Sequence, residues 1–209
     1  MPQPIPQVPS RHFRRYEHLA RAGDRSHCIY RIRDGWACRY ELLRDGRRQI
    51  TALYLPGEYC EPHWFLSGRA ELSVMALTRL IARPIPLAEI HRPGDDGVKD
   101  VLGAMVQTME RQTQSIIRLG RKNATERIVE LLADLRNRLG SHDDTVVIPL
   151  TQREIADIVG LTPVHVNRVL HRLAEQKCVY MHGRSLFAAA QMSVLYQSAA
   201  PAEKRGDQG

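Results

Sequence analysis

The chain has 209 residues, of which 43% are hydrophobic and 25% charged, and this composition is that of a globular protein rather than a disordered or fibrous one. Its net charge of +7 and its pI near 9.5 favour a polyanionic partner, although such a balance also occurs in proteins that have none. No apolar run reaches the roughly 18 residues of a membrane span, and the N-terminus lacks the pattern of a signal peptide, so we expect a soluble, cytoplasmic protein without membrane contact.

The first part of the chain, residues 1–97, is predicted to form an all-β domain of roll or barrel type, with a Pro-rich extension over residues 1–15. Asp34-Gly35 and Asp45-Gly46 are dipeptides that accept positive φ in tight hairpins. The residues between them alternate as in a half-buried strand, with one face made of Trp36, Cys38, Tyr40 and Leu42. Residues 49–55 predict a second strand, and apolar runs at 72–77 and 80–90 complete the domain.

Residues 98–119 are predicted to form one long helix. Its seam positions are spaced alternately by 4 and 3 residues, as in a coiled coil, and the polar Gln112 can set the register. Two interpretations stay open, because such a helix either packs on its own domain or pairs with a second copy. In the second case the chain is a homodimer, and its interface residues are Val98, Leu102, Met105, Met109, Gln112, Ile116 and Leu119.

Residues 120–198 are predicted to form a second domain, which begins with a helix over about 123–139 and a strand over 146–150. Residues 199–209 have the composition of a disordered tail. Thr151 and Glu154 have the spacing of a capping box at the start of a short helix, which Gly160 ends. Thr162-Pro163 starts another helix that runs to about residue 176, so the pair forms a helix-turn-helix.

The second of these helices places its apolar residues inward and its polar and basic residues outward. Such side chains reach base edges when the helix lies in the major groove of DNA, whereas the alternative is a solvated charged face on an ordinary helical hairpin. Residues 178–181 and 186–188 predict a hairpin wing that can place a basic side chain on a phosphate. The residues expected at double-stranded DNA are Thr151, Gln152, Thr162, Val164, His165, Asn167, Arg168, His171, Arg172 and, in the wing, Arg184.

These segments resemble the Crp/Fnr family of regulators. Residues 151–160 (TQREIADIVG) are similar to the family's first helix-turn-helix helix, and residues 166–173 (VNRVLHRL) to its recognition helix. Upstream, the stretches similar to its cyclic-nucleotide-binding-type domain are DGWACRYELL, DGRRQI and LPGE, at 34–43, 45–50 and 55–58. The resemblance implies an α+β fold with an N-terminal β-roll (a double-stranded β-helix), a long dimerisation helix and a C-terminal winged helix-turn-helix. It also implies a homodimer that binds an inverted-repeat promoter site and contacts RNA polymerase.

The resemblance has a gap at the site where family members hold a cyclic nucleotide. Those members bind the phosphate with a Gly-Glu-Leu stretch and, after a short helix, an Arg-Ser pair. Here the pair falls on Ala70 and Glu71, and a carboxylate repels a phosphate. A shift of one residue would restore Arg69, but not the serine or the Gly-Glu-Leu stretch. We therefore expect no control by cAMP or cGMP.

Cofactor and metal sites have weak support in the sequence. The four cysteines, Cys28, Cys38, Cys60 and Cys178, are widely spaced, which suits reduced thiols rather than disulfides, a zinc site or an iron-sulfur cluster. A haem or metal could recruit His27, Cys60 or His63, and Cys60 could be a redox thiol, but inert, structural cysteines are the commoner case. We therefore expect no cofactor and no metal.

The recognition helix also departs from the family pattern. Val164 occupies a position where many members have Glu, and Pro163 one where they have Arg or Ser, whereas the base-reading Arg is matched by Arg168. Valine contacts a thymine methyl group but cannot accept from a cytosine amino group, so the operator should differ from the family's usual half-site. No catalytic motif is found, and we expect no enzyme. The alternative function is a ligand-sensing or protein-docking β-roll with an incidental basic helix.

Overall fold

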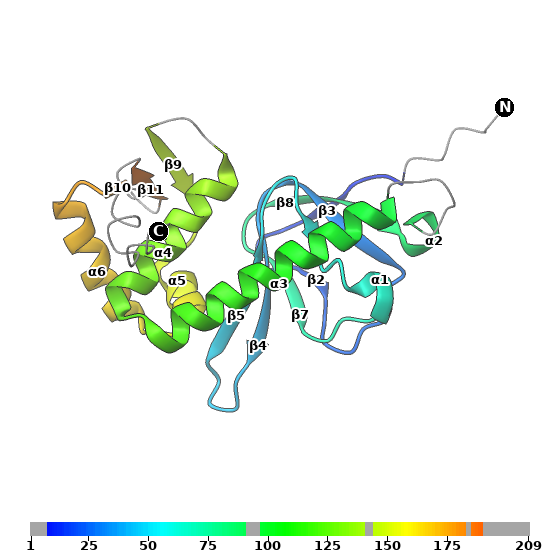
Figure 1. Cartoon of the computed structure of the whole chain (residues 1–209), viewed down its shortest axis with the longest axis horizontal. Helices are drawn as coiled ribbons and strands as arrows, with labels where there is room; N and C mark the ends of the chain where they lie inside the picture. The colour runs from blue at the N-terminus through cyan, green and yellow to red at the C-terminus, as the bar shows by residue number, and fades with distance from the viewer. Residues whose placement is uncertain (1–7, 91–96, 141–143, 183–184, 190–209) are drawn as a thin grey trace, which may run out of the picture. The chain divides into compact units, whose positions relative to one another are not determined.

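A computed structural model describes residues 8–90, 97–140, 144–182 and 185–189 (Figure 1). The chain divides into two compact units, residues 1–117 and 118–209. The long helix α3 (Gly97–Arg121) begins in the first unit and ends in the second. None of the helices in these ranges is long and apolar enough to cross a bilayer.

The first unit is built from two four-stranded antiparallel sheets. In spatial order, one contains β1 (Arg11–Phe13), β8 (Leu80–Pro86), β3 (Cys28–Asp34) and β6 (Tyr59–Cys60). The other contains β2 (His18–Ala20), β7 (Ser73–Ala76), β4 (Ala37–Leu42) and β5 (Arg48–Tyr54). Two short helices, α1 (Trp64–Ser67) and α2 (Leu87–Ile90), follow β6 and β8. The predicted β-roll is confirmed. Two details differ: the apolar run 80–90 ends in the short helix α2, and the segment 1–15, predicted to be an extension, contains strand β1.

The core of this unit draws buried side chains from both sheets and from α1, among them Ile29, Ile32, Tyr54, Trp64 and Leu80. Of the two predicted hairpins, the one at Gly46 (φ +81°) is present and joins the paired strands β4 and β5. The Asp34-Gly35 turn also has a positive φ (+79°), but the hairpin prediction is wrong there, because the turn joins β3 of one sheet to β4 of the other. The alternation expected along the first strand is wrong at both ends. Ala37 belongs to the core and is as buried as Trp36 and Cys38, with which it was expected to alternate, and Leu42 is 64% exposed. The reason at Leu42 is the neighbouring strand: β7 pairs with β4 only from Ala37 to Tyr40, so the β4–β5 hairpin extends beyond the sheet that would cover it.

The second unit contains α4 (Ala124–Leu139), α5 (Gln152–Val159), α6 (Pro163–Glu175) and a three-stranded antiparallel sheet. The sheet order is β10 (Val179–His182), β11 (Ser185–Ala189), β9 (Thr145–Ile148). Asn123 caps α4, since its side chain accepts from the amides of Thr125 and Glu126. Gly140 ends α4 in the left-handed conformation. The predicted winged helix-turn-helix is therefore present.

Candidate nucleic-acid interface

The two helices of the helix-turn-helix are delimited by capping side chains. The amide of Glu154 donates to Thr151 Oγ1 (3.2 Å), and the Thr151 amide donates to Glu154 Oε2 (2.7 Å), which completes a capping box at the start of α5. Gly160 ends α5 at φ +66°. Thr162 Oγ1 accepts from the His165 amide (3.3 Å), and proline occupies the first turn of α6. These contacts make the turn short and hold the start of α6 in a defined direction.

Helix α6 has one buried face and one accessible face. Val166, Val169, Leu170 and Leu173 are buried, as expected. On the accessible face, Val164 is 71% exposed near the helix N-terminus. Thr162, Arg168, His171 and Arg172 are exposed, whereas Thr151, Gln152, His165 and Asn167 are half-buried. An apolar side chain left this open at the start of a helix, next to an exposed arginine, suits contact with the edges of bases.

Two hydrogen bonds join this accessible face to other helices and are not visible in the sequence. Asn167 Nδ2 donates to Gln152 Oε1 (3.1 Å), and Arg172 Nη2 donates to Thr125 Oγ1 of α4 (3.4 Å). In addition, Arg127 of α4 donates to the carbonyl of Val159 at the end of α5 (3.3 Å). Helix α4 therefore contacts both helices of the motif, and its Thr125 accepts a hydrogen bond from the Arg172 side chain.

The wing strands are anchored to the same domain. Strand β11 pairs with β10 and with β9, so Phe187 lies between Tyr180 and Val147 in register. The buried Arg136 of α4 donates to the carbonyl of Ala188 (3.1 Å). Arg184, the predicted phosphate contact in the wing, lies outside the described residues.

Helix α3 presents a different seam from the predicted one. Val98 and Met105 pack against the core of the β-roll, Gln112 is half-buried, and the Leu119 side chain lies beside Gly160 of the second unit. Val98 and Met105 thus lie on the intramolecular face of the helix. The exposed apolar stripe consists of Leu102, Val106, Met109 and Ile116, at 45%, 55%, 64% and 71% exposure, with the exposed Thr113 between the last two. A regular 4-3 spacing in the sequence does not show which face of the helix packs against the β-roll. In the structure the exposed stripe starts at Leu102.

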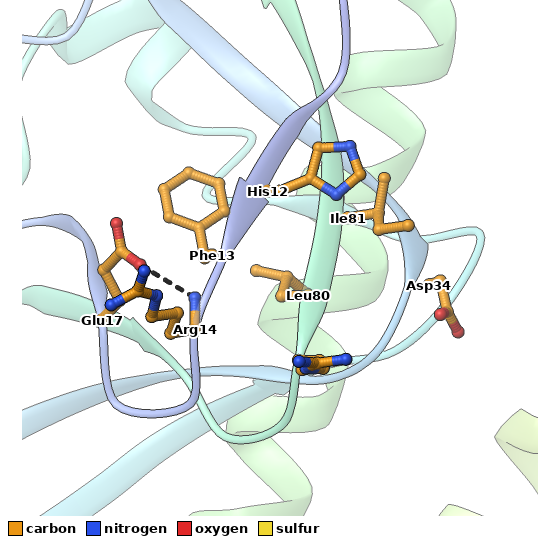
Figure 2. A pocket seen from close by; sticks show the side chains of 8 residues that line it. His12, Phe13, Arg14, Glu17, Asp34, Leu80 and Ile81 are labelled. Carbon is orange, nitrogen blue, oxygen red and sulfur yellow. Dashed lines mark hydrogen bonds between the residues drawn. The ribbon is translucent and has the colours of Figure 1, made fainter.

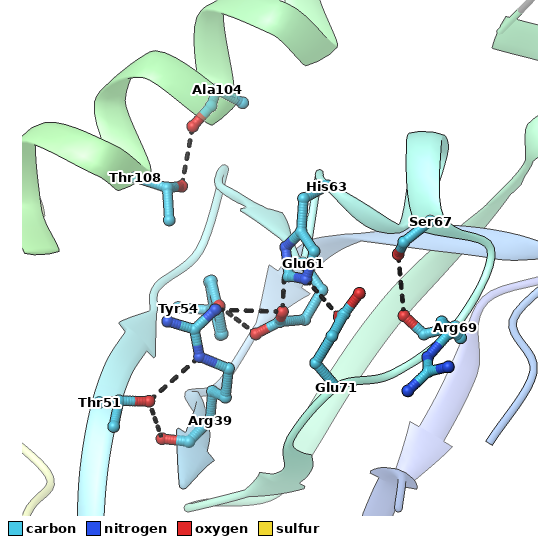
Figure 3. Close-up of polar contacts among 10 residues, drawn as sticks. All are labelled: Arg39, Thr51, Tyr54, Glu61, His63, Ser67, Arg69, Glu71, Ala104 and Thr108. Atoms are coloured by element: carbon cyan, nitrogen blue, oxygen red, sulfur yellow. Dashed lines mark hydrogen bonds and ion pairs between the residues drawn. The ribbon is translucent and has the colours of Figure 1, made fainter. Parts of the chain in front are cut away.

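A buried carboxylate network lies within the β-roll, beside the start of α1, which His63 precedes (Figure 3). Glu61 is 1% exposed and accepts hydrogen bonds or ion pairs from Tyr54 Oη, from Arg39 Nη1 (3.5 Å) and from His63 Nδ1 (3.3 Å). Burial and the adjacent Glu61 charge raise the pKa of Tyr54 well above its ordinary value. Glu61 also has φ +53°, a conformation that is unfavourable for a non-glycine residue and that the surrounding contacts must offset. Arg39, Tyr54 and His63 thus hold the carboxylate of Glu61 inside the β-roll.

The positions expected to hold a cyclic phosphate contain no suitable donor pair. Ala70 is buried, with its amide bonded to the Asp24 carbonyl (2.9 Å). Glu71 pairs instead with His63 Nε2 at 2.6 Å. Burial tends to raise the pKa of Glu71, but hydrogen bonds from His63 and Ser67 outweigh it, and the pKa is lowered. The charged form is therefore favoured where the family places serine.

The thiols do not form a site in the part of the chain that the structure describes. Cys38, Cys60 and Cys178 are buried and Cys28 is half-buried. Burial, with Glu61 nearby, raises the pKa of Cys60 well above its ordinary value, which is the opposite of what a reactive thiol needs. Across the described ranges, no three His, Cys, Asp or Glu side chains come together as metal ligands.

A separate open groove lies on the β-roll beside β1 and β8 (Figure 2). Its lining mixes cations, Arg14 and Arg79, with the carboxylates of Glu17 and Asp34. Glu17 Oε2 accepts from the backbone amide of Arg14 (2.8 Å). Because charges of both signs line it, the groove lacks the uniform positive potential that a nucleic acid requires.

Comparison with known proteins places this geometry among characterised regulators. Residues 126–195 match the Crp-like helix-turn-helix domain, and residues 10–92 match the cyclic nucleotide-binding domain. The nitrogen fixation regulation protein FixK of Rhizobium meliloti is 29% identical over 162 residues, which are 75% of this chain and 71% of that protein. FixK of Bradyrhizobium diazoefficiens is 28% identical over 179 residues, covering 82% and 75%. The transcriptional activator FnrL of Cereibacter sphaeroides is 27% identical over 175 residues, covering 78% and 69%.

The fold is similarly matched. The structure of FixK2 from Bradyrhizobium japonicum superposes with a TM-score of 0.82 at 24% identity, covering 93% of this chain and 98% of that one. A Crp-family regulator from Thermus thermophilus, TTHB099, gives a TM-score of 0.75 at 21% identity, covering 92% and 100%. With a Crp-like helix-turn-helix domain, a cyclic-nucleotide-binding-type domain and transcription regulators as its relatives, the chain belongs to the Crp/Fnr family of transcription regulators.

Proposed function

We propose that the protein is a homodimer that binds an inverted-repeat promoter site and regulates transcription there, with α6 of each protomer in the major groove of one half-site. The observation that carries the proposal is the accessible face of α6, where Val164 and Arg168 are exposed opposite a fully buried apolar face. Arg168 lies within two turns of the Thr162 cap, so its guanidinium can reach a base edge.

Each side chain of this face has a role that follows from its chemistry. Arg168 binds guanine O6 and N7 in a bidentate contact, and Val164 packs on a thymine methyl group. Thr151, Gln152 and Thr162, at the N-termini of α5 and α6, suit phosphate oxygens. His165 lies beside these base-reading residues, and His171 and Arg172 lie further along α6, nearer the backbone, with Arg184 of the wing as a further phosphate contact.

Dimerisation is assigned to the exposed stripe of α3, from Leu102 through Val106, Met109 and Thr113 to Ile116. An apolar stripe with 4-3 spacing is a coiled-coil seam, and pairing with a second copy removes it from water. A two-fold symmetric dimer presents two recognition helices related by that symmetry, and this is why an inverted repeat is expected.

Regulation by a cyclic nucleotide is not part of the proposal. The Glu61 carboxylate already occupies the donors Arg39, Tyr54 and His63, and Glu71 adds a second negative charge. A cyclic phosphate near these groups would be repelled. The residues present therefore do not fit the ligand after which the domain is named.

The remaining assignments follow from DNA binding and from the family. A regulator of promoters acts in the cytoplasm and contacts RNA polymerase, and we assign no enzymatic activity, cofactor or metal. The alternative function, a ligand-sensing or protein-docking β-roll with an incidental basic helix, makes a different prediction. An incidental basic face binds selected and random duplexes alike, whereas a regulator binds its selected site far more tightly.

The test begins with selection of bound duplexes from a random pool and continues with Arg168→Ala. This variant should lose about 1–3 kcal/mol per half-site and relax discrimination at one base pair. Arg184→Ala should instead weaken all sequences alike and lower the salt dependence by about one phosphate contact per protomer. Arg79→Ala, an exposed arginine of the β-roll unit, is the matched control and should change neither property. If Arg168→Ala lowered the affinity for all single-base variants of the site by the same factor, Arg168 would be a contact to the DNA backbone and not to a base.

A further inference from the structure

The hydrogen bond between Asn167 and Gln152 joins the two helices of the motif at its accessible face. Asn167 precedes Arg168 on α6, and Gln152 is the first residue of α5, directly after the Thr151 cap. Asn167 Nδ2 is the donor and Gln152 Oε1 the acceptor, at 3.1 Å, between residues 15 apart in the chain. Both side chains are half-buried, so each keeps part of its polar surface accessible.

This contact determines which groups of Asn167 remain available. A carboxamide has one oxygen acceptor and two N–H donors, and the bond to Gln152 uses one of the donors. The oxygen and one N–H are left, and together they match adenine, which offers an N6 amino donor and an N7 acceptor in the major groove. Guanine offers two acceptors there, O6 and N7, and one remaining N–H cannot serve both.

We infer that Asn167 reads an adenine in each half-site and that Gln152 is a positioning residue that holds the Asn167 carboxamide in the orientation needed for this. Because the bond uses only Oε1 of Gln152, its own amino group stays free to donate to a phosphate oxygen. The hydrogen bond between Gln152 and Asn167 then couples a DNA phosphate contact of α5 to a base contact of α6. This inference rests on the proposed function, since it requires that α6 lies in the major groove.

The test compares the full-length protein with Asn167→Ala and Gln152→Ala on the selected operator and on all single-base variants of one half-site. Asn167→Ala identifies the base pair it reads as the one where preference is lost. Wild-type protein should prefer adenine there by about 5- to 150-fold, the range of one bidentate contact. Gln152→Ala should bind the operator but lose most of this preference, and it should have no further effect on preference in the double variant.

Two further variants separate positioning from general binding. Gln152→Glu keeps an oxygen acceptor for Asn167, so adenine preference should persist while affinity falls for every duplex, because the added charge faces phosphates. Gln176→Ala removes an exposed carboxamide at the end of α6 and should leave the preference unchanged. Circular dichroism melting of each variant distinguishes misfolding from loss of contact.

Several results would overturn the inference. Guanine preference at that base pair would mean that Asn167 presents two donors. An equal loss on all duplexes with Gln152→Ala, and unaltered discrimination, would make Gln152 a phosphate contact alone. Unchanged base preference with Asn167→Ala would remove Asn167 from readout. If the wild-type protein selects a site and any of these three results is found, only this inference fails. If the wild-type protein selects no site, the proposed function itself is contradicted.

Discussion

Alanine substitutions at Gly35 and Gly46 should have very different effects, although both glycines lie in Asp-Gly turns at nearly the same positive φ. A Cβ at residue 35 would lie 2.0 Å from the carbonyl oxygen of Arg79 and 2.7 Å from Thr78 Oγ1. A Cβ at residue 46 would meet nothing within 4 Å. An alanine at either position would therefore have the same backbone strain, but only the alanine at residue 35 would clash with Arg79 and Thr78.

The magnitude follows from these two terms. A non-glycine residue in the left-handed region costs about 1–2 kcal/mol, and this is the whole effect expected at Gly46. At Gly35 the backbone must also move away from a turn held by hydrogen bonds, from the Trp36 amide to Thr78 Oγ1 and from that hydroxyl to the Arg79 carbonyl, each 2.8 Å. Each lost bond costs about 1 kcal/mol, so Gly35→Ala should destabilise the β-roll by about 3–4 kcal/mol.

The assay is equilibrium unfolding in guanidinium chloride at one protein concentration, because a dimer's stability depends on concentration. Fluorescence reports the β-roll unit, since Trp36 and Trp64 are the two tryptophans of the chain. Gly46→Ala is the matched control. Equal shifts of the two unfolding free energies would refute the argument that the Arg79 contact, rather than φ, dominates at Gly35.

Three other predictions concern assembly, ligand and thiols. Replacing Met109 and Ile116 together by Glu should give monomers with weakened operator binding, and an unchanged dimer in equilibrium sedimentation would disprove the α3 stripe as the interface. Calorimetric titration with cAMP or cGMP should show no saturable heat, whereas micromolar affinity would mean that the Glu61 network gives way to a ligand. In the native protein only the half-buried Cys28 should react quickly with a thiol reagent, and rapid loss of the Cys60 thiol would contradict its burial and raised pKa.

Local signals were sufficient for the helix-turn-helix. Thr151 and Glu154 contact each other across three residues, and Thr162 caps the helix that Pro163 begins, so each helix start is specified within one turn of chain. The buried face of α6 followed from 3.6-residue periodicity for the same reason. Such interactions depend little on the rest of the fold, and the sequence by itself therefore determined the motif, its polarity and its exposed Arg168.

Contacts between residues far apart in the chain were decided only by the tertiary structure. The 4-3 pattern of α3 identified a helix with a seam, but packing on the β-roll determined that Met105 is covered and Val106 is free. Glu61 meets Arg39 and Tyr54 only because β4, β5 and the segment after β6 converge in the roll. No local pattern encodes such pairings, since burial and hydrogen-bond partners depend on which elements the fold brings together.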